Sequence, residues 1–332
     1  MLNHDSSFEY QLQREWEAAE GYLRRAQRIL AITHVAPDGD AIGSLLGFTL
    51  AMRGAGKLVT PACQDAAQVR YDYLSGIHEI KQSADGNYDL IVALDASDLQ
   101  RLGNVFVPAQ HARLPIVVFD HHITNTLFGL VNVIEPNVSS TCELVLKLIR
   151  RMDLPLTAEI ATALLTGIVT DSLAFRTSNT TPDTLAAAMD LMKTGVSLAE
   201  ITRKSLVLRT YDSLKFMAAG IMASQLEDGI VWACITRKLR REAGYKEDRG
   251  DGNLVNTLIT AMEAHIAAVF VENADGSIEI GFRAAPGYDV SQVAFELGGG
   301  GDPAAAGCTL PGPMRDAVNR VLPRLRQVIR EA

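Results

Sequence analysis

The sequence predicts an α/β protein that contains two β-sheets. In the N-terminal half, short apolar runs alternate with stretches of helical periodicity, which is typical of a parallel sheet covered by helices. Three further strand-like runs in the C-terminal third indicate a second, smaller sheet. The chain has 332 residues, of which 48% are hydrophobic, and this is enough for two hydrophobic cores.

The chain is predicted to begin with a helix, a strand and a second helix. Residues 10–28 space their apolar side chains as a helix does and lead into the apolar run 29–33, which we interpret as a strand. A helix is predicted over 40–54, where apolar side chains again recur at helical spacing and Gly54 and Gly56 mark the end.

Further strands are predicted at 58–62, 90–94 and 116–119. The last two are continuous apolar runs, the pattern of strands buried on both faces of a sheet. Helical periodicity then returns in three segments, 141–152, 158–169 and 182–194. These segments would supply the helices that a covered parallel sheet requires.

The segment 196–211 is polar, basic and helical in period, so we interpret it as a connector between domains. Strands of the second sheet are predicted at 230–235, 266–271 and 278–282. An amphipathic helix at 314–329 contains Pro323, which predicts a kink or a late start. The expected domains are 1–195, a helical linker at 196–212, and 213–332.

Composition argues against several classes of protein. No apolar run approaches the ~20 residues of a membrane helix, so we expect a cytoplasmic protein with no membrane partner. The four cysteines form no Cys-x-x-Cys pair, which indicates reduced thiols rather than a thiolate zinc site. A formal net charge of −8 opposes binding to duplex nucleic acid, although a bound metal pair reverses the sign locally.

Acidic and imidazole side chains follow three predicted strands and one predicted helix. They are His34, Asp38 and Asp40 after 29–33, Asp95 after 90–94, Asp120, His121 and His122 after 116–119, and Asp171 after 158–169. Taken singly, Asp40 and Asp95 are also interpretable as helix caps and Asp171 as a helix end. Because the carboxyl ends of parallel strands meet at one sheet edge, we expect these side chains to converge.

Four carboxylates in one small volume repel one another unless cations lie between them. Two divalent ions would supply the compensating charge. Carboxylate and imidazole ligands without thiolate suit Mn²⁺ or Mg²⁺. Two such ions about 3.5–4 Å apart are the arrangement that activates a water and stabilises a phosphoryl oxyanion.

The order of these motifs resembles the DHH phosphoesterase superfamily. Segments 120–126, 132–143, 166–171 and the glycine run 297–301 also look like family segments, and the resemblance extends from about residue 20 to 312. It implies an N-terminal parallel-sheet DHH domain flanked by helices. It further implies a smaller C-terminal α/β DHH-associated domain, with the active site in the cleft between the two.

The resemblance also implies a role for each motif residue. His34 and Asp38 would hold one metal, Asp40, His121 and Asp171 the other, and Asp95 would bridge both. His122 would act on the substrate phosphate as a proton donor or oxyanion partner, and Asp120 would orient the imidazoles. The expected cofactors are two Mn²⁺, with Mg²⁺ or Co²⁺ as alternatives.

A phosphate clamp is implied in the C-terminal domain. Its members would be Arg283 and the backbone of Gly299, Gly300 and Gly301. Asp302 departs from the family pattern, which has histidine after the glycine run, and the strand of Arg283 continues with Ala284 instead of a hydroxyl residue. Asp302 is equally interpretable as a helix N-cap followed by Pro303.

The leading hypothesis is a manganese-dependent phosphoesterase that converts short oligoribonucleotides, dinucleotides or pAp-type 3′-phosphonucleotides to 5′-mononucleotides. Its partners would be short single-stranded RNA or a phosphonucleotide. The single-stranded DNA exonucleases of the superfamily are longer, and its type II pyrophosphatases carry a basic cluster that this chain lacks. The alternatives are an exopolyphosphatase and a nucleotide-binding sensor with an altered clamp, and homodimer formation stays open.

Overall fold

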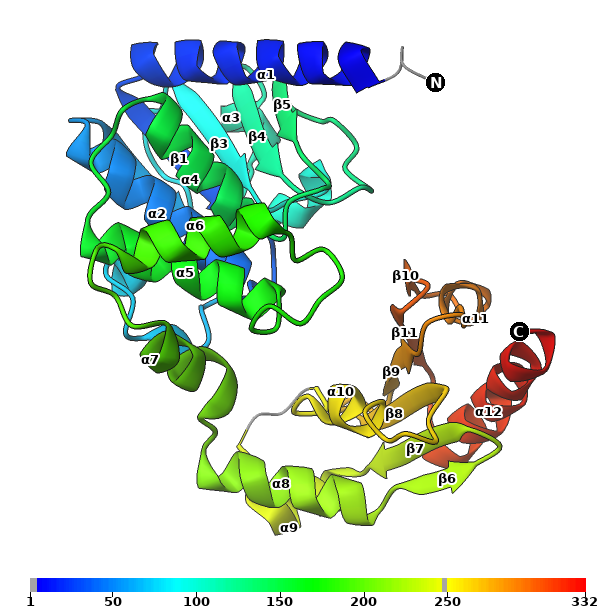
Figure 1. The fold of residues 1–332 in the computed structure, drawn as a ribbon. Coiled ribbons are helices and arrows are strands. Elements are labelled where there is room, and N and C mark those ends of the chain that lie inside the picture. Colours follow the sequence, from blue (N-terminus) through cyan, green and yellow to red (C-terminus); the bar gives the residue numbers. More distant parts are fainter. Residues whose placement is uncertain (1–4, 247–249) are drawn as a thin grey trace. The chain divides into compact units, whose positions relative to one another are not determined.

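A computed structural model describes residues 5–246 and 250–332 (Figure 1). The chain divides into two compact units, Met1–Leu208 and Arg209–Ala332. The segment interpreted as a connector contains the short helix α7 (Leu198–Thr202) and the π-helical turn η4 (Arg203–Val207), both within the first unit. The division into 1–195, 196–212 and 213–332 stays a prediction.

The first unit contains a five-stranded parallel sheet with the order β2-β1-β3-β4-β5 (Figure 1). Its strands are β1 (Arg28–Thr33), β2 (Leu58–Ala62), β3 (Leu90–Leu94), β4 (Ile116–Asp120) and β5 (Val131–Ile134). The four predicted strands are confirmed. The edge strand β5 was not predicted, because it has only four residues and alternates buried with half-buried side chains.

Helices cover this sheet. They are α1 (Asp5–Arg25), α2 (Gly39–Gly54), α3 (Pro108–His111), α4 (Thr141–Arg151), α5 (Ala158–Asp171) and α6 (Pro182–Met192), with 3₁₀ turns η1 (Val69–Tyr71), η2 (Ile77–Glu79) and η3 (Leu99–Val105). The larger core packs α1, α2, α4 and α5 against one face of the sheet. A second cluster, which includes Leu102 and Val105 of η3, covers the other face.

Close packing of α2 on α5 brings the start of one helix near the end of the other. Gly43 and Gly47 make this possible, since a Cβ on Gly47 would lie 2.4 Å from Leu164 and one on Gly43 would lie 2.5 Å from the carbonyl oxygen of Ala163. Most side chains of both helices are apolar, and α2 is almost wholly buried. None of the helices in the described part of the chain combines the length and the hydropathy that a membrane span requires.

The second unit contains a six-stranded sheet with the order β10-β11-β9-β8-β7-β6, antiparallel except for the pair β7 and β8. Its strands are β6 (Gln225–Glu227), β7 (Ile230–Ile235), β8 (Ile266–Glu272), β9 (Ile278–Ala284), β10 (Gly300–Asp302) and β11 (Ala305–Leu310). Its helices are α8 (Tyr211–Met222), α9 (Arg237–Ala243), α10 (Leu254–Leu258), α11 (Ser291–Glu296) and α12 (Met314–Glu331).

Two details of this unit differ from the sequence predictions. Asp302 does not cap a helix: β10 pairs with β11, and Pro303 and Ala304 connect the two strands. Pairing of β11 with β9 satisfies the backbone groups that a helix would otherwise bond, so the cap interpretation is wrong. The C-terminal helix begins at Met314 and continues through Pro323, so the late start is also wrong.

Candidate metal centre

The predicted ligand residues converge at the carboxyl edge of the parallel sheet. Three groups of three residues could each hold a metal ion, and within each group the ligand atoms lie within 4.8 Å of one another. The groups are His34, Asp38 and Asp95; Asp40, His121 and Asp171; and Asp95, His121 and His122. They come from the ends of β1, β3 and β4, the start of α2 and the end of α5. All three groups consist of carboxylates and imidazoles.

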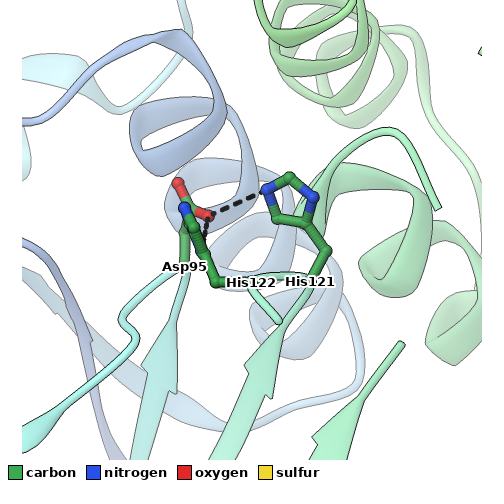
Figure 2. Close-up of side chains that lie close together, drawn as sticks. All are labelled: Asp95, His121 and His122. Carbon is green, nitrogen blue, oxygen red and sulfur yellow. Dashed lines mark ion pairs between the residues drawn. The ribbon is translucent and has the colours of Figure 1, made fainter. Parts of the chain in front are cut away.

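Asp95 lies between the first two groups. Its Oδ2 is 3.5 Å from Nε2 of His34, and its Oδ1 is 3.7 Å from Nε2 of His121. Figure 2 shows its carboxylate facing the imidazoles of both His121 and His122. Thr141 Oγ1 donates a hydrogen bond of 3.0 Å to Oδ1 and fixes its orientation. The two oxygens of this carboxylate therefore face two different sets of ligand atoms.

Local hydrogen bonds orient His34 and Asp38. Nδ1 of His34 lies 2.7 Å from the carbonyl oxygen of Val35, which makes it the N–H donor and leaves Nε2 as the ligand atom. Asp38 is the N-cap of α2 and accepts from the backbone N–H groups of Asp40 and Ala41. This helix does not have its cap at Asp40, the alternative interpretation of that residue. Asp38 takes it because its extended backbone (φ −96°, ψ −162°) precedes the first helical residue.

Asp40 instead binds the start of another helix. Its carboxylate accepts hydrogen bonds of 2.6 Å and 3.0 Å from the backbone N–H groups of Thr141 and Cys142 on α4. Its Oδ2 also lies 3.9 Å from Nε2 of His121, and that nitrogen lies 3.7 Å from Oδ2 of Asp171. Asp40 thus connects α2, α4 and the second ligand group.

Two acidic side chains of this cluster, Asp40 and Asp171, resist losing their protons. Burial, followed by the charges of Asp95 and Asp38, raises the pKa of Asp40 well above its usual range. Burial and the charge of Asp40 raise the pKa of Asp171 to about 8. Burial opposes ionisation of Asp95 too, but the nearby His34 and the other imidazoles bring its pKa down to about 2. Divalent cations would relieve this repulsion, so the cluster fits a metal pair.

Cys142 lies beside the cluster but is unsuited as a ligand. Its Sγ lies 3.7 Å from the carbonyl oxygen of Asp40. Burial and the charge of Asp40 raise the pKa of this thiol well above its usual range, so it stays protonated. The donors available to a metal are therefore hard oxygen and imidazole nitrogen atoms, which favour Mn²⁺ and Mg²⁺ over thiolate-seeking metals.

His122 is held as a cation by Asp120. Its Nδ1 lies 2.6 Å from Oδ1 of Asp120, a fully buried carboxylate that also accepts from Asn125 Nδ2 and the backbone N–H of His121. The hydrogen bond to Asp120 raises the pKa of His122 to about 9. The His122 side chain is 41% exposed, which leaves Nε2 available to donate to a ligand. Sequence reasoning assigned no role to Asn125 or Thr141, since only tertiary contacts bring them to the cluster.

Comparison with known proteins identifies the family. Residues 28–168 match the DHH family, N-terminal domain, and residues 246–331 match the DHHA1 domain. A bifunctional oligoribonuclease and PAP phosphatase NrnA from Thermus thermophilus is 34% identical over 310 residues, which cover 92% of this chain and 91% of that protein. The chain belongs to the DHH family.

Two solved structures share the fold of this DHH protein. An exopolyphosphatase-related protein from Bacteroides fragilis superposes with a TM-score of 0.88 at 23% identity and covers 96% of this chain and 98% of its own. RecJ in complex with Mn²⁺ from Thermus thermophilus gives a TM-score of 0.52 at 14% identity, with 97% of this chain and 55% of that chain covered. The predicted α/β fold of the DHH and DHH-associated domains is thereby confirmed.

The expected clamp residues of this DHH protein lie on or next to strands β9 and β10 of the second unit, which β11 separates. Arg283 on β9 pairs with Ala305 on β11, and Ala305 pairs with Asp302 on β10. Side chains directly opposite on paired strands point to the same face, so Asp302 and Arg283 share one face, about 10 Å apart. Nε of Arg283 donates a hydrogen bond of 2.7 Å to Oδ1 of Asn256, a partner that was not predicted from the sequence.

The three glycines of this clamp differ in what the fold requires of them. A Cβ on Gly299 would lie 2.1 Å from the carbonyl oxygen of Gly307. Gly301 has φ +138°, and a Cβ there would lie 2.5 Å from the carbonyl oxygen of Ala305. Nothing lies within 4 Å of a Cβ on Gly300. Packing therefore explains Gly299 and Gly301, whereas it leaves Gly300 unexplained.

Proposed function

We propose that this chain is a two-metal phosphoesterase that cleaves short oligoribonucleotides and pAp-type 3′-phosphonucleotides to 5′-mononucleotides. The observation that carries the proposal is Asp95, whose two carboxylate oxygens face two separate sets of imidazole and carboxylate ligands. The substrate class is supported by the Thermus thermophilus relative, which is named for oligoribonuclease and PAP phosphatase activity and is similar along nearly the whole chain.

In this proposal His34 and Asp38 hold one Mn²⁺, Asp40, His121 and Asp171 hold the other, and Asp95 contacts both. The donor set and the raised pKa values of Asp40 and Asp171 favour divalent cations here. A bound metal pair supplies an activated water and polarises the phosphoryl oxygen. Mg²⁺ and Co²⁺ are the alternatives that metal titration would distinguish.

The protein's own part in the reaction falls to His122 and to the clamp. As an imidazolium, His122 donates a proton or a hydrogen bond from Nε2 to the phosphate, while Asp120 fixes its ring through Nδ1. Arg283 and the backbone N–H groups of Gly300 and Gly301 bind the terminal phosphate of the substrate, whereas the N–H of Gly299 already donates a hydrogen bond of 2.8 Å to the carbonyl oxygen of Ala294. Asp302 weakens that binding through its negative charge.

The decisive experiment combines metal analysis with a substrate panel. The purified protein is supplied with Mn²⁺ and offered pApA, pAp and tripolyphosphate, and bound metal is measured by elemental analysis. We expect about two Mn²⁺ per chain and hydrolysis of the two nucleotides. Asp95→Asn should lose both metal and hydrolysis, whereas Asp183→Asn, an exposed carboxylate on α6, should change neither. A wild-type chain without bound divalent metal or Mn²⁺-stimulated hydrolysis would refute the proposal.

A further inference from the structure

Left-handed backbone is concentrated around the metal cluster. Apart from glycine, Asp and Asn, the described residues with positive φ are Ala36, Leu127, Leu173, Ala174 and Phe175. All five lie within five residues of a member of the cluster. A side chain with a Cβ meets steric repulsion in this region, so such residues persist only where the surrounding structure holds them.

The most unusual part is the run of three residues that begins two positions after Asp171. Leu173, Ala174 and Phe175 have φ values of 47°, 59° and 65°. Hydrogen bonds hold the run in place: Ala174 N–H donates 2.8 Å to the carbonyl oxygen of Val169, and Phe175 N–H donates 3.0 Å to the hydroxyl of Ser172. Glycine would adopt these angles without steric cost. A leucine at the first position therefore indicates a use for its side chain.

That side chain is partly exposed and follows the cluster residue Asp171 by two positions. Leu173 is 47% exposed, and Ile123, the residue after His122, is 86% exposed. The segments that carry them meet in the cluster, since Nε2 of His121 lies 3.7 Å from Oδ2 of Asp171. Each of the two ligand-bearing segments thus continues into an exposed apolar side chain within two residues of a cluster member.

We propose that Leu173 and Ile123 are specificity residues that pack against a nucleobase of the substrate while its phosphate lies at the metal cluster. Apolar side chains offer nothing to a phosphate chain, whereas a nucleobase presents a flat apolar face that gains from being removed from water. The inference rests on the proposed phosphoesterase function. It narrows the substrate class to nucleotides with an intact base and disfavours inorganic polyphosphate.

The test separates the side chain from the backbone strain. Leu173→Gly removes both, whereas Ala174→Gly removes strain from the same turn and keeps the leucine. We expect both variants to raise Tm by about 2–4 °C. Only Leu173→Gly should lower kcat/KM for pApA, by about fivefold and through KM, which corresponds to about 1 kcal/mol. Leu173→Asn, whose side chain tolerates left-handed backbone, and Ile123→Ala should show a similar kinetic loss.

Substrate analogues identify the base as the group that is contacted. The probes are pApA and its two analogues in which one base is replaced by hydrogen. With the analogue that lacks the contacted base, Leu173 has nothing to pack against, so wild type and Leu173→Gly should have equal kcat/KM values. Equal losses on all three substrates, or a kcat loss shared with Ala174→Gly, would overturn the inference and assign the turn to the positioning of Asp171.

The remaining outcomes separate this inference from the function on which it rests. If wild type hydrolyses pApA and both Leu173→Gly and Ile123→Ala match it, nucleobase packing is refuted while the phosphoesterase function stands. If wild type with Mn²⁺ hydrolyses none of the substrates, both are refuted.

Discussion

Gly300→Ala tests whether the glycine run binds phosphate. Its backbone lies outside the left-handed region and a Cβ would meet nothing within 4 Å, so the fold accommodates a methyl group there. Replacing glycine at a compatible site stabilises a protein by about 0.4–1 kcal/mol, because it restricts the unfolded chain. If a phosphate binds this backbone, the added methyl group would keep it from reaching the N–H, and the lost charge-assisted hydrogen bond is worth about 1.5–3 kcal/mol. The variant should therefore be slightly more stable yet have a KM for pAp that is at least about tenfold higher.

The assay measures Tm together with kcat and KM for pAp and pApA. Gly54→Ala is the matched control, since Gly54 also has open space around its Cβ position but ends α2 in the first unit. Gly301→Ala should behave differently from both, because left-handed φ and the contact with Ala305 make it destabilising by about 1–3 kcal/mol. An unchanged KM in a folded Gly300→Ala protein would refute phosphate binding at this backbone.

Three further predictions concern charge and the adjacent histidines. Asp302→Asn should raise kcat/KM for pAp by about two- to fifteenfold, more at low salt, since the like charges of Asp302 and of a phosphate bound at Arg283, about 10 Å away, repel each other by about 0.4–1.7 kcal/mol; no change at any ionic strength would contradict this. Asp120→Asn removes the charge that raises the pKa of His122 to about 9, so the alkaline limb of the pH–rate profile should move down toward pH 6.5. The rate should fall by up to about 30-fold at pH 8 and by less than about twofold at pH 6. An unmoved limb would exclude His122 as the titrating group. His121→Ala should lower the Mn²⁺ content, whereas His122→Ala should keep it and lower kcat by about 10² or more; equal metal loss in both would refute the separate roles.

The gathering of the site could be predicted because it depends on topology alone. β1, β3 and β4 are adjacent parallel strands, so the residues that follow them must lie at one edge of the sheet. The positions of His34, Asp95 and Asp120 at this edge follow from the strand order alone and need no knowledge of side-chain contacts. Asp171 is different, because its position depends on the packing of α5 against α2, which the sequence indicates only through the resemblance to a family.

Other features depend on local conformation or on partners distant in the sequence. Whether Asp38 or Asp40 caps α2 is decided by backbone angles, and both residues fit the composition of a cap. Asp302 and Pro303 match the start of a helix, yet the open edge of β9 gives the following residues a strand partner. Local sequence signals therefore fail to predict the secondary structure of a segment wherever pairing with a strand distant in the sequence satisfies the same backbone groups.

Hydrogen bonds within the protein position the ligand side chains. Asp38 is fixed by the first turn of α2, Asp40 by the first turn of α4 and Asp95 by Thr141. His34 is fixed by the carbonyl of its neighbour, and His122 by Asp120. Each bond engages one part of the side chain and leaves another atom facing the cluster, which is how a preorganised metal site is built. The same bonds hold together carboxylates that repel one another, as the raised pKa values of Asp40 and Asp171 show. A ligand that brings positive charge would therefore stabilise the folded chain most.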